Sequence, residues 1–127
     1  MRIVLFIALL AIALWAAPCG SIALFQFTFI DSALAAEISN GSKIFNANCS
    51  SCHIGGGNIL ISEKTLKKEA LSKYLEDYDA DSIQAIIYQV QNGKNAMPAF
   101  KNKLSEQEII EVAAYIFQKA ELGWQDS

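Results

Sequence analysis

A Cys-x-x-Cys-His motif at Cys49, Cys52 and His53 constrains this chain more than any other feature of its sequence. Two thiols and an imidazole within about one helical turn have the spacing at which a c-type haem is attached. Each thiol can form a thioether bond to the porphyrin, and His53 can bind the iron as an axial ligand. The motif therefore predicts one covalently bound haem c, which the apolar residues of a small chain must cover as well as one another.

Two other roles of paired thiols fit the sequence less well. A Cys-x-x-Cys thiol redox site normally lies within alternating strands and helices, and the segments around Cys49 show no such alternation. A zinc site needs four ligands, and beyond residue 35 the only Cys and His residues are Cys49, Cys52 and His53, so a carboxylate would have to complete the set. Haem attachment uses all three residues.

Residues 1–35 have the pattern of a secretory signal peptide. Arg2 precedes an almost uncharged apolar run over residues 3–30, and the run is followed by the small residues Ala33 and Ala35. A basic start, an apolar middle and a small-x-small exit are typical of an export signal. We expect cleavage after Ala35, which leaves residues 36–127 as a cytochrome c domain with no stable membrane insertion.

Two alternatives for this leader remain open. The apolar run is long enough to span a bilayer if it stays uncut, and the chain would then be a tethered haem domain. Pro18 and Gly20 interrupt the run, however, and the Ala-x-Ala exit favours cleavage. Cys19 could carry a lipid, but it follows Ala-Ala-Pro, a poor context for lipoprotein processing, so we interpret it as a small apolar residue of the leader.

The charge of the chain excludes one class of function. The formal net charge is −3, and the leader holds one acid and one base, so residues 36–127 carry the same charge. A nucleic-acid-binding protein needs a basic surface to neutralise phosphates, and we expect no nucleic-acid partner. The leader lacks the Arg- and Ser-rich pattern of an organelle presequence, which favours a bacterial or organelle-encoded gene and an extracytoplasmic compartment.

The remaining sequence predicts an all-α fold of about four short helices. The first is expected over residues 39–48, with Ser39 or Asn40 as its cap and Gly41 allowing a close crossing by another helix. The second is expected over residues 65–78, where apolar residues recur with helical period. A loop containing Gly55, Gly56 and Gly57 joins them, and its flexible backbone can fold tightly against a flat ring.

Capping signals mark the last two helices. Asp81, followed by Gln84, predicts the start of the third helix, and Asn92-Gly93 predicts its end. Ser105 with Glu108 forms the pattern of a capping box, and the final helix is expected to reach about Glu121. The predicted buried faces are Ile83, Ile86, Ile87 and Val90 on the third helix, and Ile109, Val112, Ala113, Ile116, Phe117 and Ala120 on the fourth.

Met97 is the candidate for the second axial ligand. It is the only Met beyond residue 35, and it lies in a polar loop just before Pro98 rather than on a helical stripe. Pro98 biases Met97 toward extended backbone. His53 and Met97 together would fill both axial positions and give a high reduction potential. An iron with six ligands has no vacancy for oxygen or peroxide, so the sequence predicts an electron carrier and not an enzyme.

Residues 36–127 resemble the cytochrome c6 family, the class I c-type cytochromes of cyanobacterial and algal thylakoids. The resemblance rests on Gly41-x-x-x-Phe45, on Asn48 to His53, on Lys64-Thr65-Leu66, on the long segment from Tyr88 to Phe100 that ends in Met-Pro-Ala-Phe, and on Ala114-Tyr115-Ile116 with Trp124.

This resemblance implies a small class I cytochrome c fold whose first and last helices cross, with Gly41 and Phe45 against Tyr115. It implies a soluble monomer in the thylakoid lumen that carries single electrons from the cytochrome b6f complex to photosystem I. It also implies that Gln89 packs near the haem and keeps the potential high. One departure is Lys103, where the family often has Arg; Lys keeps the charge but loses the planar fork, so docking there is expected to differ.

Other extracytoplasmic proteins with a single c-type haem are the alternatives. One is a respiratory carrier that delivers electrons to a terminal oxidase. Another is a haem-based sensor or a peroxidase-like protein, in which an exogenous ligand displaces Met97.

Overall fold

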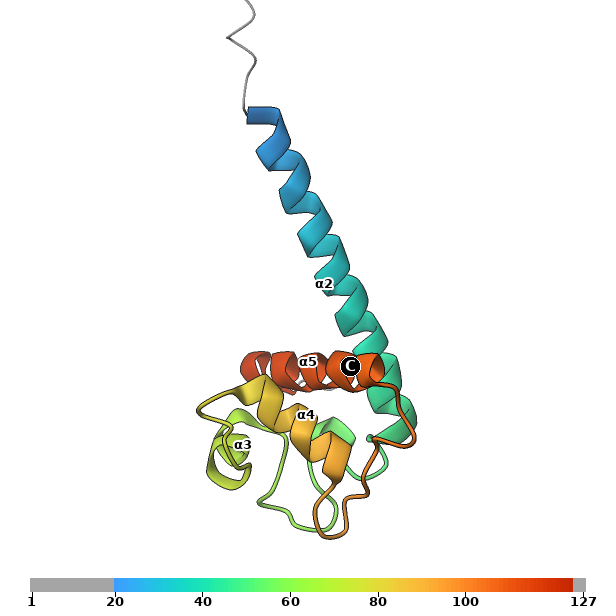
Figure 1. Cartoon of the computed structure of the whole chain (residues 1–127). Helices are drawn as coiled ribbons and strands as arrows, with labels where there is room; N and C mark the ends of the chain where they lie inside the picture. Colours follow the sequence, from blue (N-terminus) through green and yellow to red (C-terminus); the bar gives the residue numbers. More distant parts are fainter. Residues whose placement is uncertain (1–19, 125–127) are drawn as a thin grey trace, which may run out of the picture. The chain divides into compact units, whose positions relative to one another are not determined.

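The computed structural model of this chain describes residues 20–124 (Figure 1). The chain divides into two units, residues 1–33 and residues 34–127. Of the first unit, residues 20–33 are helical, while residues 1–19, which include Cys19 and most of the expected signal peptide, lie outside the described residues. Within residues 20–124, no helix is both long enough and apolar enough to cross a membrane.

The first helix, α2, runs over Gly20–Asn48. The predicted start at residue 39, with Ser39 or Asn40 as the cap, is therefore wrong for the uncut chain. Between Gly20 and Ser39 there is no Pro, and the Ala-rich stretch before Ser39 favours helix, so elongation by one hydrogen bond per residue continues through this segment. The backbone N–H groups near Ser39 have carbonyl partners in the preceding turn, and no side-chain cap is needed there.

The next two elements are short. A single 3-10 turn, η1, occupies Ile54–Gly56, and helix α3 occupies Lys68–Tyr74. The helix predicted over residues 65–78 is therefore shortened at both ends, because Lys67 and Leu75 have extended backbone. Tyr78 is nevertheless buried. The sequence pattern therefore identified a buried residue correctly, although Tyr78 lies in a turn after α3 and not in the helix.

Helix α4 runs over Ser82–Asn92, and its cap is confirmed: the Asp81 side chain accepts a hydrogen bond from the Gln84 backbone N–H. Gly93 ends it with φ 67, in the left-handed region that favours glycine. Helix α5 runs over Glu106–Leu122, and both hydrogen bonds of the Ser105–Glu108 capping box are present.

Helices α4 and α5 pack along each other and form the main layer of the core (Figure 1). The buried faces predicted for these two helices are confirmed, although Ile83 and Phe117 are only partly buried. The buried apolar residues are Phe45, Leu71, Tyr78, Ala85, Ile86, Ile87, Val90, Phe100, Ile109, Val112, Ala113, Ile116 and Ala120.

Helix α2 meets α5 at Gly41, as expected. A Cβ atom at Gly41 would lie 2.7 Å from the Tyr115 Cβ and would also collide with the Glu111 carbonyl, so only glycine lets the two backbones approach this closely. One turn further along α2, the Phe45 and Tyr115 rings pack with centroids 5.5 Å apart. Residues 20–124 contain helices and no named strand, so the predicted all-α class is confirmed.

Candidate haem site

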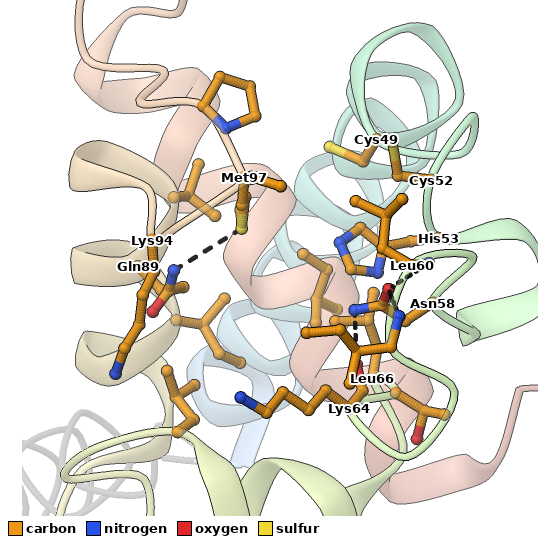
Figure 2. Close-up of a pocket in the computed structure, with 18 of the residues that line it drawn as sticks. Cys49, Cys52, His53, Asn58, Leu60, Lys64, Leu66, Gln89, Lys94 and Met97 are labelled. Atoms are coloured by element: carbon orange, nitrogen blue, oxygen red, sulfur yellow. Dashed lines mark hydrogen bonds between the residues drawn. The ribbon is translucent and has the colours of Figure 1, made fainter.

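A largely apolar cavity of about 380 Å³ lies inside the unit of residues 34–127. Figure 2 shows His53 and Met97 on opposite sides of it, with Cys49 and Cys52 beside His53 and with Gln89 beside Met97. The cavity thus brings together all five residues singled out in the sequence. Its apolar lining includes Phe45, Leu60, Ile61, Leu66, Leu71, Leu75, Ile86, Val90, Pro98, Phe100 and Ile116.

His53 reaches the cavity from the turn that follows α2. The His53 backbone N–H donates to the Cys49 carbonyl at 2.9 Å, which continues the helical turn and keeps the imidazole close to the two thiols. The His53 Nδ1 lies 2.9 Å from the Gly57 carbonyl oxygen. Because a carbonyl only accepts, Nδ1 carries the proton, and in the neutral imidazole Nε2 is then the nitrogen with the free lone pair. A hydrogen bond of this kind is typical of imidazoles that bind metals, since it sets both tautomer and orientation.

Met97 reaches the cavity from a tight turn after α4. Lys94 and Met97 exchange two backbone hydrogen bonds, with N···O distances of 3.0 and 3.1 Å. Asn95, inside the turn, has φ 55, a conformation that Asn tolerates better than most residues. A Cβ at Gly93 would overlap the backbone of residues 97–99, so the glycine lets this loop fold back on the end of α4. The Met97 thioether is therefore held on an ordered turn.

Gln89 contacts the Met97 sulfur directly. Its Nε2 donates to the Met97 Sδ at 3.7 Å, and both side chains are half-buried. Thioether sulfur is a weak acceptor, so this bond contributes little to the stability of the fold. From the family resemblance we expected Gln89 to pack near the haem. In the structure Gln89 lines the cavity on the same side as Met97 and contacts its sulfur.

The two thiols are free and lie at the edge of the cavity, Cys49 half-buried and Cys52 exposed. Burial raises the pKa of the Cys49 thiol to about 11, against the smaller opposing effect of the Lys103 charge. A thiol redox site requires a lowered pKa, because the thiolate is the nucleophile. The environment of Cys49 therefore does not suit thiol–disulfide exchange. Among the described residues no group of three or more His, Cys, Asp or Glu could hold a metal ion.

Two polar residues at the cavity add to the five candidates. Lys103 lines it, with Nζ 5.5 Å from the centre of the Phe100 ring. Asn58 also lines it: its Oδ1 accepts from the Leu60 and Ile61 backbones, each at 3.0 Å, and its Nδ2 donates to the Lys64 carbonyl at 3.0 Å. Sequence analysis missed Asn58, although an Asn after three glycines is a signal for a side chain that organises a turn.

The arrangement fits a c-type haem. One imidazole can offer its Nε2, one thioether faces it across apolar walls, and two free thiols lie on the imidazole side for covalent attachment. Imidazole with thioether is the ligand pair found in cytochromes c of high potential. An all-α unit with this site defines a class I c-type cytochrome.

Comparisons with known proteins agree with this class and narrow it. Residues 36–116 match the family model described as cytochrome C oxidase, cbb3-type, subunit III. A cytochrome c6 of Nostoc sp. is 55% identical over 103 residues, which cover 81% of this chain and 89% of that protein. The cytochrome c6 of Thermostichus vulcanus is 52% identical over 104 residues, covering 82% and 88% respectively.

A solved structure shows the same similarity. The crystal structure of cytochrome c6 from the diatom Phaeodactylum tricornutum superimposes with a TM-score of 0.65 at 53% identity, covering 68% of this chain and 98% of that one. The chain belongs to the cytochrome c6 family. Its cofactor is one covalently bound haem c, and its role is that of an electron carrier in photosynthetic electron transport.

Proposed function

We propose that this chain is exported to the thylakoid lumen and carries single electrons there from the cytochrome b6f complex to photosystem I. In this proposal Cys49 and Cys52 bind the haem covalently, and His53 and Met97 are its axial ligands. The observation that carries the proposal is the pair formed by His53 and Met97, the only His and the only Met beyond residue 35, which face each other across one apolar cavity (Figure 2).

The bound haem supplies a site that gains and loses one electron. The protein's residues determine how easily this happens. The Gly57 carbonyl accepts from the His53 Nδ1 and orients the imidazole, while the Gln89 amide donates to the Met97 sulfur and lowers its donor strength. The apolar walls exclude water and so disfavour the extra positive charge of oxidised iron. The Gln89 hydrogen bond and the exclusion of water both favour the reduced state, as a carrier with a high potential requires.

The exposed surface beside the cavity supports transfer between proteins. Ile59 and Leu60 are 61% and 63% exposed, and Leu60 lines the cavity, so an apolar surface lies next to the electron-transfer site. Lys103 adds a positive charge at the same cavity. A small apolar contact with nearby charge suits a short-lived complex, in which charge guides the encounter and dissociation stays fast. The cytochrome b6f complex and photosystem I are the partners that this role requires.

Two observations support removal of residues 1–35. The family model begins to match at residue 36, the first residue after the proposed cleavage site. Ala33 and Ala35, the small residues of that site, are both exposed. Export of the chain would bring the thiols to a compartment outside the cytoplasm, where they must remain reduced until haem attachment.

The decisive experiment measures photosystem I reduction after a laser flash, with the haem-loaded protein reduced beforehand by purified cytochrome b6f complex. We expect the rate of photosystem I reduction to rise with the concentration of the protein and to fall when His53 is replaced. A reduced protein that transfers electrons to a terminal oxidase but not to photosystem I would contradict the proposal in favour of a respiratory carrier. Rapid binding of carbon monoxide by the reduced protein at neutral pH would instead favour a sensor or a peroxidase-like protein.

A further inference from the structure

Trp124, near the end of the chain, packs onto the loop that follows the haem-attachment motif. Its indole Nε1 donates to the Leu66 carbonyl at 2.8 Å, and its ring packs on the Phe45 ring with centroids 5.2 Å apart. Gly56, which is buried and has φ +74, lies against the indole so closely that a Cβ atom there would overlap the ring. The sequence led us to expect that the glycine loop packs against a flat ring. At Gly56 that ring is the indole of Trp124.

A short series of hydrogen bonds connects the indole to His53. The Leu66 backbone N–H donates to the Gly56 carbonyl at 2.7 Å, so the residue that accepts from Trp124 also holds Gly56. The Gly56 backbone N–H donates to the His53 carbonyl at 3.0 Å. The next residue, Gly57, provides the carbonyl that accepts from the His53 Nδ1 at 2.9 Å. Trp124 thus contacts the turn that orients the imidazole.

The loop itself has little intrinsic rigidity. Gly55, Gly56 and Gly57 are consecutive, and glycine loses more conformational freedom on ordering than any other residue. Gly55 and Gly56 both have positive φ. A turn of this composition needs external contacts to hold one carbonyl within hydrogen-bond geometry. On one side Trp124 supplies them through its ring against Gly56 and its N–H to Leu66.

We propose that Trp124 is a positioning residue that clamps the Gly56–Gly57 turn and thereby fixes the hydrogen bond from the His53 Nδ1 to the Gly57 carbonyl. This inference rests on the proposed function, since it takes His53 as an axial ligand. A fixed Nδ1 hydrogen bond keeps the imidazole in one tautomer and one orientation and raises its basicity toward iron. Trp124 therefore influences the reduction potential through the Gly56–Gly57 turn and the His53 hydrogen bond.

The test compares Trp124→Phe with Ile109→Val in the haem-loaded protein. Trp124→Phe keeps an aromatic ring over Gly56 but removes the N–H donor. Ile109→Val removes one methyl group from the core of α5, outside the cavity, and serves as a control for a general loss of stability. We expect the Nδ1 proton of His53, followed by NMR in the reduced protein, to exchange roughly tenfold faster in Trp124→Phe, as befits loss of one hydrogen bond.

A second readout is the midpoint potential. We expect Trp124→Phe to shift it upward, because a weaker Nδ1 hydrogen bond makes His53 a poorer donor to iron and disfavours the oxidised state. Ile109→Val should change neither the proton exchange nor the potential. Unchanged exchange and potential in Trp124→Phe, with only the stability loss seen in Ile109→Val, would overturn the inference and leave Trp124 a packing residue.

A measurement on the unaltered protein keeps the inference testable if Trp124→Phe does not retain haem. In mild denaturant, the indole N–H of Trp124 and the Nδ1 proton of His53 should become exchangeable in the same local opening. Protection of the His53 proton after the indole proton has exchanged would overturn the clamp. A visible spectrum without a His–Met pair would overturn the ligand assignment and the clamp together, whereas an intact pair with uncoupled exchange overturns the clamp alone.

Discussion

The Gln89 Nε2 lies 3.7 Å from the Met97 Sδ and donates a hydrogen bond to it. The donor comes from the last turns of α4 and the acceptor from the turn that follows the helix, so the bond joins two segments on either side of Gly93. A hydrogen bond to the sulfur withdraws electron density from it. It therefore affects the balance between reduced and oxidised iron, if Met97 is the ligand that we propose.

Replacing Gln89 by Val should lower the midpoint potential by tens of millivolts. A hydrogen bond contributes about 0.5–1.5 kcal/mol, and for one electron about 59 mV corresponds to a tenfold change in the equilibrium constant, so the upper bound is roughly 65 mV. Gln91→Val makes the same chemical change two residues later on α4, outside the cavity lining, and should leave the potential in place. Redox titration of both variants tests this, and equal potentials would show that the Gln89 contact has no electronic effect.

Met97→Ala should remove the second axial ligand. The midpoint potential should fall, because the choice of axial ligands sets haem potentials over a range of roughly 0.8 V. The variant should also bind carbon monoxide and reduce photosystem I more slowly. Asn95→Gly changes the same turn at φ 55, where glycine is well tolerated, and should retain the original potential and spectrum. A potential in Met97→Ala equal to that of the unaltered protein would show that the thioether is not a ligand.

Gly41→Ala should destabilise the protein, although alanine is the better helix former by about 1 kcal/mol. The added Cβ would lie 2.7 Å from the Tyr115 Cβ at the crossing of α2 and α5, and overpacking of this kind costs about 1–3 kcal/mol. A lower free energy of unfolding would show that the steric clash at the helix crossing outweighs the better helix propensity of alanine. Thermal unfolding of Gly41→Ala, with exposed Lys43→Ala as the near-neutral control, provides the measurement; a rise in Tm would contradict the close crossing.

Acid should weaken the start of α5. Hydrogen bonds from the Ser105 backbone N–H and hydroxyl lower the pKa of Glu108 below its usual value. A carboxyl whose pKa is lower in the folded state stabilises the fold above its unfolded pKa and loses that contribution as pH falls through the folded pKa. Between pH 5 and pH 3, Tm should therefore fall more for the unaltered protein than for Glu108→Gln, which cannot titrate. Parallel pH profiles for the two proteins would argue against this linkage.

Processing after Ala35 should give a protein that begins at Ala36. N-terminal sequencing of the haem-loaded protein from an exporting host tests this directly. Replacing Ala35 by Leu removes the small side chain that the small-x-small exit requires, and the leader should then be retained. Glu37→Gln, which lies just beyond the site, should leave processing unchanged. Recovery of a chain that starts at Met1 from the unaltered gene would instead indicate a tethered haem domain.

The features that the sequence by itself determined are those built from neighbouring residues. The caps at Asp81 and Ser105 were predictable because each side chain bonds to a backbone N–H three residues later. The buried faces of α4 and α5 were predictable because helical period alone places such residues on one side. The Cys49–Cys52–His53 motif is equally local, so it indicated the cofactor before any fold was known.

Local patterns were less informative about where helices begin and end. The start of α2 at Gly20 and the contraction of α3 to Lys68–Tyr74 were not predicted. Because α2 continues through the leader residues, no cap is needed at Ser39. Helix α3 lacks the first and last turns that were predicted, because Lys67 and Leu75 have extended backbone. Periodicity indicates which residues are buried, but not whether the turn that carries them is helical.

Only the tertiary structure decided which distant residues meet. His53 lies on the turn after α2 and Met97 on the turn after α4, and they face each other across one cavity only because the folded domain brings these two turns together. Trp124 and Leu66 are 58 residues apart, and no short-range pattern links them. Such contacts form because burial of the shared apolar core brings these segments together, and the core depends on the packing of the whole domain rather than on any one segment.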